Sequence, residues 1–289
     1  MDNHSAFNTG QTQRAQRFRR LHQPGEPFIL ANVWDAASAH VVATAGAQAI
    51  ATSSGAVSWA HGVQDGGNLD LDTVRVSLQE IVAAAGDLPV SADIESGYAQ
   101  DPNGVAASVA AAIAAGVVGI NLEDSGAPAD SPTAPLYSLD DQTARIAAAR
   151  QAAERTGSQL FINVRTDVFL FGVRAEEGRY DDVVTRARAY RDAGADGLFV
   201  PGLLDLDLLS QIHHATDLPL NAMWLPGAPS LADLAKAGIA RLSVGTALFQ
   251  ATYTYAQRVA EKLLTQGSYT DLEDTLSYGE LNAAFRATS

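Results

Sequence analysis

Short apolar runs alternate with longer amphipathic stretches along most of the chain. Each run holds few charged residues, and such continuous apolar segments are typical of parallel strands that are buried on both faces. The predicted strands are residues 28–34, 49–55, 90–95, 117–124, 160–167, 197–201, 218–224 and 241–245. Helices are predicted at residues 35–44, 70–85, 103–115, 139–155, 181–193, 203–214, 229–237 and 247–265. Eight strand–helix units in this order favour an α/β fold, a closed (β/α)8 barrel of the TIM type.

Glycine marks the end of several predicted helices. Gly46, Gly116, Gly194 and Gly238 each follow an alanine directly before a predicted strand. Glycine there can adopt the left-handed conformation that ends a helix and turns the chain into the next strand. An open, doubly wound sheet is the competing architecture. It is disfavoured because no G-x-G-x-x-G motif follows the first predicted strand.

Both ends of the chain carry additional segments. Residues 9–21 predict a short basic helix with a solvated arginine face, and residues 1–10 are expected to be disordered. Residues 271–289 predict a C-terminal helical extension. The 289 residues have the length of one α/β barrel, so we expect a single domain from residue 1 to residue 289.

Composition narrows the function classes. The formal net charge is −14, so no nucleic-acid partner is expected, because a phosphate-binding surface needs clustered Lys and Arg. The chain has no cysteine, which excludes disulfides, thiolate zinc sites and cysteine nucleophiles. The first residues lack the apolar stretch of a secretory signal, and segment 105–115 is too short and too weakly apolar to span a bilayer. We therefore expect a cytoplasmic protein that does not insert into membranes.

Two carboxylates end the third predicted strand. Side chains alternate along a strand, so Asp93 and Glu95 point to the same side. The two negative charges repel each other unless a cation lies between them, and a hard divalent ion with oxygen ligands, such as Mg²⁺, meets that need. A solvent-exposed carboxylate pair in a polar loop is the alternative explanation.

Further polar residues follow the other predicted strands. In a (β/α)8 barrel the C-terminal ends of the strands face the active site. These candidates are Asn32, Trp34, Asp35, Ser53, Ser54, Gly55, Glu123, Asp124, Arg165, Asp167 and Asn221, with Asp65 in the loop after the second strand. Several carboxylates with one arginine suit a magnesium site beside an anionic substrate. Arg165 would bind a carboxylate or phosphonate group, and the backbone N–H groups of Ser54, Gly55 and Ala56 would bind the remaining anionic oxygens.

Four motifs on successive strand ends carry a family resemblance. They are Ser-Ser-Gly at 53–55 with Gly-Val-Gln-Asp at 62–65, Asp-Ile-Glu-Ser-Gly-Tyr at 93–98, Asn-Leu-Glu-Asp at 121–124 and Asn-Val-Arg-Thr-Asp at 163–167. From about residue 32 to residue 245 the chain resembles the isocitrate lyase/phosphoenolpyruvate mutase superfamily. The resemblance implies a barrel that binds Mg²⁺, with Mn²⁺ as an alternative. It also implies a pyruvate-like enolate that is stabilised while a neighbouring C–C or P–C bond breaks or forms.

The resemblance also implies roles for individual residues. Asp93 would bind the metal directly, and Glu95, Asp65 and Glu123 would hold its water ligands. Arg165 would grip the 2-oxo acid together with the amides at 54–56. The superfamily tends to exchange its last barrel helix between subunits, so residues 247–265 imply a homodimer or homotetramer with swapped helices.

Other side chains are candidates by position alone, and each has an alternative explanation. Tyr98 could place a phenol near the metal, or it could pack in the core. Trp34 and Trp59 could form an aromatic wall for the substrate, or they could be core residues. His61 could act as an acid or base, or it could be a loop residue. The candidate catalytic residues are Asp65, Tyr98, Glu123 and Arg165, and the candidate substrate-binding residues are Trp34, Ser54, Gly55, Ala56, Arg165 and Asn221.

The chain departs from the superfamily pattern in two places. Residues 125–137, which match the gating loop, contain no Cys, Lys or His, and the sixth predicted strand ends in Val-Pro-Gly without a histidine. Thiol-based lyase chemistry is therefore absent. We expect a Mg²⁺-dependent lyase that cleaves a C–C bond next to a 2-oxo acid, by retro-aldol cleavage or decarboxylation through an enolate. The alternatives are a phosphoenolpyruvate mutase or phosphonopyruvate hydrolase, and a barrel that binds a 2-oxo acid without turnover.

Overall fold

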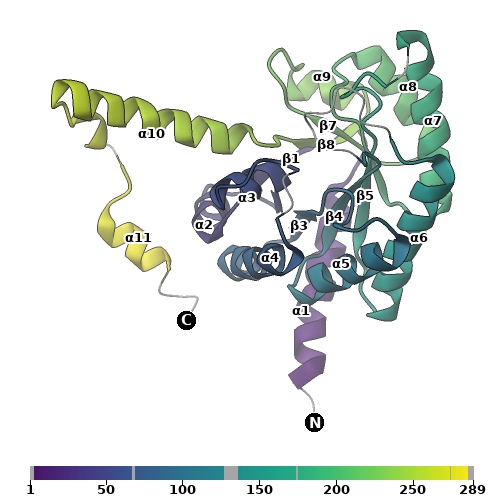
Figure 1. Cartoon of the computed structure of the whole chain (residues 1–289), viewed down its shortest axis with the longest axis horizontal. Helices are drawn as coiled ribbons and strands as arrows, with labels where there is room; N and C mark the ends of the chain where they lie inside the picture. The colour runs from purple at the N-terminus through teal and green to yellow at the C-terminus, as the bar shows by residue number, and fades with distance from the viewer. Residues whose placement is uncertain (1–2, 67–68, 127–135, 174, 274, 286–289) are drawn as a thin grey trace.

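Eight parallel strands form a closed barrel in sequence order (Figure 1). This is a computed structural model, and it describes residues 3–66, 69–126, 136–173, 175–273 and 275–285. The strands are β1 (Phe28–Val33), β2 (Ile50–Thr52), β3 (Val90–Asp93), β4 (Gly119–Glu123), β5 (Phe161–Arg165), β6 (Gly197–Phe199), β7 (Leu220–Met223) and β8 (Ile239–Ser243). The barrel closes where β8 pairs with β1, with Ser243 opposite Leu30. The predicted (β/α)8 barrel is confirmed, and the open sheet is excluded.

The helices that follow the strands mostly cover the outside of the barrel, and several begin at a polar capping residue. They are α2 (Ala36–Thr44), α3 (Ser54–Ala60), α4 (Leu71–Ala85), α5 (Pro102–Ala114), α6 (Leu139–Arg155), α7 (Glu176–Asp192), α8 (Leu206–Thr216), α9 (Leu231–Lys236) and α10 (Ala247–Gln266). The carboxylates of Asp35, Asp70, Asp101 and Asp205 each accept a backbone N–H of the first turn that follows. The predicted glycine turns are confirmed, because Gly46, Gly116, Gly194 and Gly238 have φ values of +95°, +99°, +111° and +83°.

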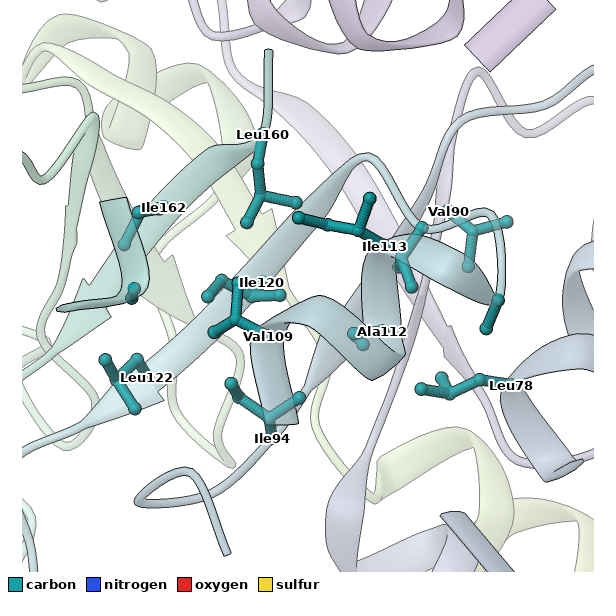
Figure 2. Packing of buried hydrophobic residues seen from close by; sticks show 14 of the residues in the cluster. Leu78, Val90, Ile94, Val109, Ala112, Ile113, Ile120, Leu122, Leu160 and Ile162 are labelled. Atoms are coloured by element: carbon teal, nitrogen blue, oxygen red, sulfur yellow. The ribbon is translucent and has the colours of Figure 1, made fainter. Parts of the chain in front are cut away.

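The largest apolar cluster lies between the barrel wall and the helices α4 to α6. Figure 2 shows Val109 and Ile113 of α5 on the side of Ile120 of β4, with Leu122 further along the strand and Leu78 of α4 on the other side of α5. All five side chains are less than 10% exposed. Each fully buried side chain of this size contributes roughly 1.5–3 kcal/mol through removal of apolar surface from water. The same packing fixes β3, β4 and β5, the strands whose ends carry most of the predicted site.

Helix α1 (Asn3–Leu21) seals the N-terminal end of the barrel. Phe18 is fully buried, and its ring lies edge-on to Phe161 with centroids 5.7 Å apart. His22 follows the helix, stacks on Phe161 at 3.9 Å and meets Phe28 edge-on at 5.0 Å. Phe28 begins β1 and Phe161 begins β5, on opposite sides of the barrel, so the aromatic group spans its floor. Helix α1 includes the predicted basic helix at residues 9–21, and the expected disorder of residues 1–10 stays a prediction.

Helix α10 leaves the barrel instead of packing along it (Figure 1). A 3₁₀ turn (Thr270–Leu272) and helix α11 (Tyr278–Ala284) follow, while residues 286–289 of the predicted extension lie outside the described residues. Large apolar side chains are exposed along this segment, among them Tyr253, Leu264 and Tyr278. Among the described helices, none has the length and apolarity that crossing a bilayer requires.

Candidate active site

A cavity of about 510 Å³ opens at the C-terminal ends of β2 to β5. Four charged side chains line it: Asp65 from the loop after β2, Glu95 from the turn after β3, and Glu123 and Arg165 at the ends of β4 and β5. Tyr98 and Ser54 line it as well. The structure thus brings together most of the predicted site. Residues 127–135 of the predicted gating loop lie outside the described residues.

Asp93, the last residue of β3, is held by the start of α3. Its Oδ2 accepts the Ser54 hydroxyl at 3.1 Å and the Ser54 backbone N–H at 3.4 Å. Its Oδ1 accepts the Glu95 N–H at 3.4 Å. Ser53 is the N-cap of α3, so the first N–H of this helix, that of Ser54, points at the Asp93 carboxylate. The Ala56 N–H is used by the Ser53 hydroxyl, so two of the three amides predicted to bind substrate have protein partners.

Helix α3 was not predicted as a helix. It has seven residues, which is too short for a helical apolar period to show in the sequence. Within it, Gly55 lies against Asp65: a Cβ at position 55 would be 2.9 Å from the Asp65 Cγ and Oδ2 atoms. Gly55 therefore serves as the small residue that lets the Asp65 carboxylate approach the helix.

Arg165, the last residue of β5, is gripped by two carboxylates. Its Nε and Nη2 donate to the two oxygens of Asp167 at 2.6 and 3.1 Å, and its Nη1 lies 2.9 Å from Glu123 Oε2. Glu123 also accepts the Ser125 hydroxyl at 2.9 Å. Burial alone would lower the pKa of Arg165, but Asp167 and Glu123 outweigh it and raise that pKa above its usual value. The guanidinium stays charged, in one orientation, beside the cavity.

A buried network behind Arg165 fixes Asp167. The Asp167 N–H donates to Asp124 Oδ1 at 3.0 Å, and Asp124 Oδ2 accepts the Tyr190 hydroxyl at 2.8 Å and Arg186 Nη1 at 3.3 Å. Asp124 and Asp167 are both fully buried. Their strand-end positions were noted in the sequence. Arg186 and Tyr190 were missed because they lie on α7, whose sequence gives no sign of which face meets a carboxylate.

The site carries more negative charge than its arginine balances. Carboxyl groups of Asp65, Asp93, Glu95, Glu123 and Asp167 surround the guanidinium of Arg165. Burial, then the charges of Asp93 and Asp65, raise the pKa of Glu95 to about 7. Burial and the charge of Asp93 also raise the pKa of Asp65. Within the described ranges, no three carboxylate or imidazole groups already form a compact metal-binding cluster, so the carboxylates surround the cavity without meeting at one point.

Two predicted substrate contacts lie away from this cavity. Trp34 is 7% exposed and packs edge-on against Phe249 of α10, with ring centroids 5.0 Å apart. Asn221 is buried inside the barrel, where its Nδ2 donates to the Ser243 hydroxyl at 3.1 Å. The pairing of β7 with β8 shifts register between Leu220 and Asn221, and alternation along the sequence cannot reveal such a shift. Neither residue is among those that line the cavity, and a substrate-binding role for them stays a prediction.

Other polar residues at the strand ends are engaged in the scaffold. The Asn32 carboxamide oxygen accepts the backbone N–H groups of Val244 and Gly245 at 3.0 and 2.9 Å, tying β1 to the exit of β8. His61 lies 3.0 Å from the Ser77 hydroxyl of α4, and Trp59 packs on Phe249. These contacts favour a packing role for His61 and Trp59 over a role in catalysis or substrate binding. Phe171 and Gln100 also line the cavity, and no sequence motif marked either of them.

Comparison with known proteins now identifies the family. The phosphoenolpyruvate phosphomutase family matches residues 18–264. The chain belongs to this family. It is 31% identical over 251 residues to an oxaloacetate decarboxylase of Pseudomonas entomophila, covering 82% of this chain and 81% of that one. It is 29% identical over 274 residues to 2-methylisocitrate lyase of Escherichia coli K12, covering 89% and 90%.

A crystal structure of a candidate phosphonomutase from Burkholderia cenocepacia J2315 is also similar. It shares 44% sequence identity with a TM-score of 0.80, covering 89% of this chain and 100% of that chain. The relatives are thus lyases and a candidate mutase. This chain is a lyase or mutase of the isocitrate lyase/phosphoenolpyruvate mutase superfamily, as its strand-end motifs predicted.

Proposed function

We propose that the chain is a Mg²⁺-dependent carbon–carbon lyase that acts on a small 2-oxo or 2-hydroxy acid. The bond next to the oxo group is broken by retro-aldol cleavage or decarboxylation through an enolate. One observation carries the proposal: a single cavity joins Asp65, Glu95 and Glu123 with the fixed guanidinium of Arg165. Decarboxylase and lyase relatives at 31% and 29% identity support it.

The donor set fits a hard divalent cation. All the candidate ligands are carboxylate oxygens, which Mg²⁺ and Mn²⁺ accept. The pKa of Glu95 is raised to about 7 by burial and by its acidic neighbours, and a dication would relieve that repulsion. Asp93 would hold the metal directly, and Glu95, Asp65 and Glu123 would hold it through water. The bound ion would act as a Lewis acid that stabilises negative charge on the enolate oxygen.

The chain's own residues bind and orient the substrate. Arg165 faces the carboxylate of the 2-oxo acid, and its bonds to Asp167 and Glu123 hold it in place before substrate arrives. Burial, followed by the nearby carboxylates, raises the pKa of Tyr98 well above its usual value, so its hydroxyl stays protonated. Tyr98 lines the cavity and is our candidate for the group that delivers a proton to the product carbanion.

A second candidate function is phosphonate chemistry on the same site. The 44% identity to the candidate phosphonomutase favours it. The gating segment without Lys and β6 without a terminal histidine disfavour it. Because P–C cleavage and P–C rearrangement both change the phosphorus signal, ³¹P NMR with phosphonopyruvate separates this reading from C–C cleavage.

The deciding experiment is a turnover screen with Mg²⁺. Oxaloacetate, 2-methylisocitrate and other small 2-oxo and 2-hydroxy di- and tricarboxylates would be tested for release of pyruvate or a related oxo acid. We expect turnover of at least one of them, its loss on chelation of the metal, and its loss in Asp93→Asn. Oxalate binding by calorimetry without any turnover would replace the lyase by a barrel that only binds. Full activity of Asp93→Asn would reject the proposed site.

We also propose that two copies exchange α10 in a homodimer. Ile29 of β1 is 51% exposed, although strands of this fold are normally covered by helices on their outer face. A groove of about 1040 Å³ between α2 and α9 is lined by Phe28, Ile29 and Val42, at the place where the helix after β8 would pack to complete the ring. Helix α10 extends away with an apolar face of its own (Figure 1). Light scattering should give the mass of two or four chains, and Ile29→Glu should give one.

A further inference from the structure

The turn that follows β3 has an unfavourable backbone. Glu95 and Tyr98 have φ values of +51° and +52°, a left-handed conformation that side chains with a Cβ rarely adopt. Gly97 between them has φ +89°. Such residues persist only when the surroundings enforce them. Both Glu95 and Tyr98 line the cavity, so whatever enforces this turn also places two side chains of the site.

Arg145 of α6 grips this turn from behind. Its Nη2 donates to the carbonyl oxygens of Ser96 and Ala99, the latter at 3.0 Å, and its Nη1 donates to the Gln100 carbonyl at 3.0 Å. The side chain is 1% exposed. One rigid planar fork therefore bonds three carbonyls within five residues, which fixes the path of the backbone through the left-handed positions.

The guanidinium of Arg145 also contacts Tyr137, in the connection between β4 and α6. Arg145 Cζ lies 4.1 Å from the centre of the Tyr137 ring, a cation–π contact. Tyr137 is itself tied to the end of β4, because its N–H donates to the Asp124 carbonyl at 2.7 Å and Leu136 bridges to Ser125. Ser125 bonds Glu123. Arg145 thus connects the wall that carries Glu95 and Tyr98 with the wall that carries Glu123.

We propose that Arg145 is a positioning residue of the active site. It holds Glu95 and Tyr98 at a set distance from Glu123, and so fixes the geometry in which the acidic substrate is bound. The role of Arg145 in turnover rests on the proposed function. Its role in holding the turn after β3 does not rest on that function, so the effect on the turn and the effect on turnover can be tested separately.

Arg150 of the same helix provides a matched control. It too donates to backbone carbonyls, to Gly194 at 2.8 and 3.1 Å and to Leu160 at 3.1 Å, and it pairs with Asp196. These partners precede β5 and β6, at the N-terminal end of the barrel. The two arginines share a helix and a type of bonding, and they differ in the end of the barrel that each one holds.

The test compares Arg145→Met, Arg145→Lys and Arg150→Met in the full chain. Hydrogen exchange is measured at residues 95–100, oxalate affinity by calorimetry with Mg²⁺, and kcat and KM on whichever substrate the screen identifies. Arg145→Met should speed exchange at 95–100 by about tenfold or more, weaken oxalate binding, and lower kcat by about 10²-fold, since misplacement of about 1 Å has effects of that size. Arg145→Lys should fall between Met and wild type, because one ammonium cannot bond three carbonyls.

Arg150→Met should leave exchange at 95–100, oxalate affinity and kcat within about twofold of wild type, whatever it does to stability. The proposal is overturned if the Arg145 variants match Arg150→Met in these readouts, which would make Arg145 a general stabilising residue. If Arg145→Met does not fold, Arg145→Lys and Tyr137→Leu, with Tyr137→Phe as its ring-preserving control, give the same decision. If no substrate is turned over, exchange and oxalate affinity decide alone.

Discussion

The two ends of the barrel bury polar groups in opposite ways. At the N-terminal end, burial and the charge of Arg241 lower the pKa of His22 to about 3, so the ring is neutral and packs between phenylalanines. At the C-terminal end, five carboxylates and Arg165 remain crowded around a cavity. Burial and the neighbouring carboxylates there raise the pKa of Glu95 to about 7, so this group loses part of its charge near neutral pH but stays at the cavity. The histidine at one end is therefore neutral and packs among aromatic rings, whereas the other end gathers carboxyl groups around an open cavity.

This difference separates stability from activity along the barrel axis. Residues at the N-terminal end of such barrels contribute mainly to stability, and residues at the C-terminal end contribute to the site. If the separation holds here, a substitution at the N-terminal end should lower stability and leave activity unchanged, whereas a similar substitution at the C-terminal end should lower activity. Each of the following variants tests that expectation, beginning with the largest effect.

Arg165→Met should have the largest effect, because Arg165 pairs with two carboxylates at the C-terminal end, those of Asp167 and Glu123. Removing it leaves Asp167, which is 0% exposed, and Glu123 without their cation. We expect a loss of stability of about 3–5 kcal/mol in urea unfolding at pH 8. We also expect a fall in kcat/KM of about 10²–10³-fold, the usual cost of losing a group that stabilises charge in the transition state.

Arg75→Met is the control for this loss of a charge pair. Arg75 lies on α4 with Asp72 at 3.5 Å, and the Asp72 side chain is 89% exposed. Exposed pairs contribute little, so stability and activity should both stay near wild type. Unchanged stability in Arg165→Met would show that Asp167 does not depend on its cation, and the picture of a charge-dependent C-terminal end would be wrong.

A pair of glycine variants tests the two ends directly. At the N-terminal end, the Cβ of Gly119→Ala would lie 2.5 Å from Phe18 Cε1, an overpacking that should cost about 1–3 kcal/mol and leave kcat/KM unchanged. At the C-terminal end, Gly55→Ala should not lower stability, because alanine favours a helix by up to about 1 kcal/mol. Its methyl group would displace the Asp65 carboxylate, so kcat/KM should fall by about tenfold or more.

Both glycine variants would be measured by urea unfolding and steady-state kinetics. The crossed pattern is the informative result, with stability lost at one end and activity lost at the other. If Gly119→Ala lowers activity as much as Gly55→Ala does, the two ends are coupled through the barrel and the separation fails.

The pH dependence of stability should reveal the buried histidine. Below its ordinary pKa of 6.5, His22 in the unfolded chain binds a proton, whereas the folded chain does not bind one until about pH 3. Stability should therefore fall as pH falls through this window, by at most about 1.4 kcal/mol per pH unit. His22→Gln should lose less stability than wild type between pH 7 and pH 5. His214 is exposed, so His214→Gln serves as the control. If stability changes with pH equally in the two variants, His22 is not held neutral in the folded chain.

The apolar pattern predicted the barrel because parallel strands buried on both faces leave a strong signal. All eight strands were found, whereas α3 was missed because its seven residues are too few for periodicity. The site was predictable where a strand end supplies a functional residue, as at Asp93. Glu95 reaches the cavity from the left-handed turn after β3 and not, as predicted, by alternation along the strand. The site was not predictable where a residue acts on a distant backbone. Arg145 bonds carbonyls 45 to 49 positions away, and no sequence pattern reports such a partner.

The smallest expected effect concerns the network behind Arg165. Tyr190→Phe removes the hydroxyl that donates to Asp124 at 2.8 Å, while Arg186 still bonds the same oxygen at 3.3 Å. We expect a stability loss of about 1 kcal/mol in urea unfolding and less than about a threefold change in kcat/KM, a factor worth about 0.7 kcal/mol. Tyr180→Phe on the same helix is the control and should change neither. A tenfold fall in kcat/KM for Tyr190→Phe would show instead that Asp124 transmits its position through Asp167 to Arg165, and that the charged end depends on each hydrogen bond beneath it.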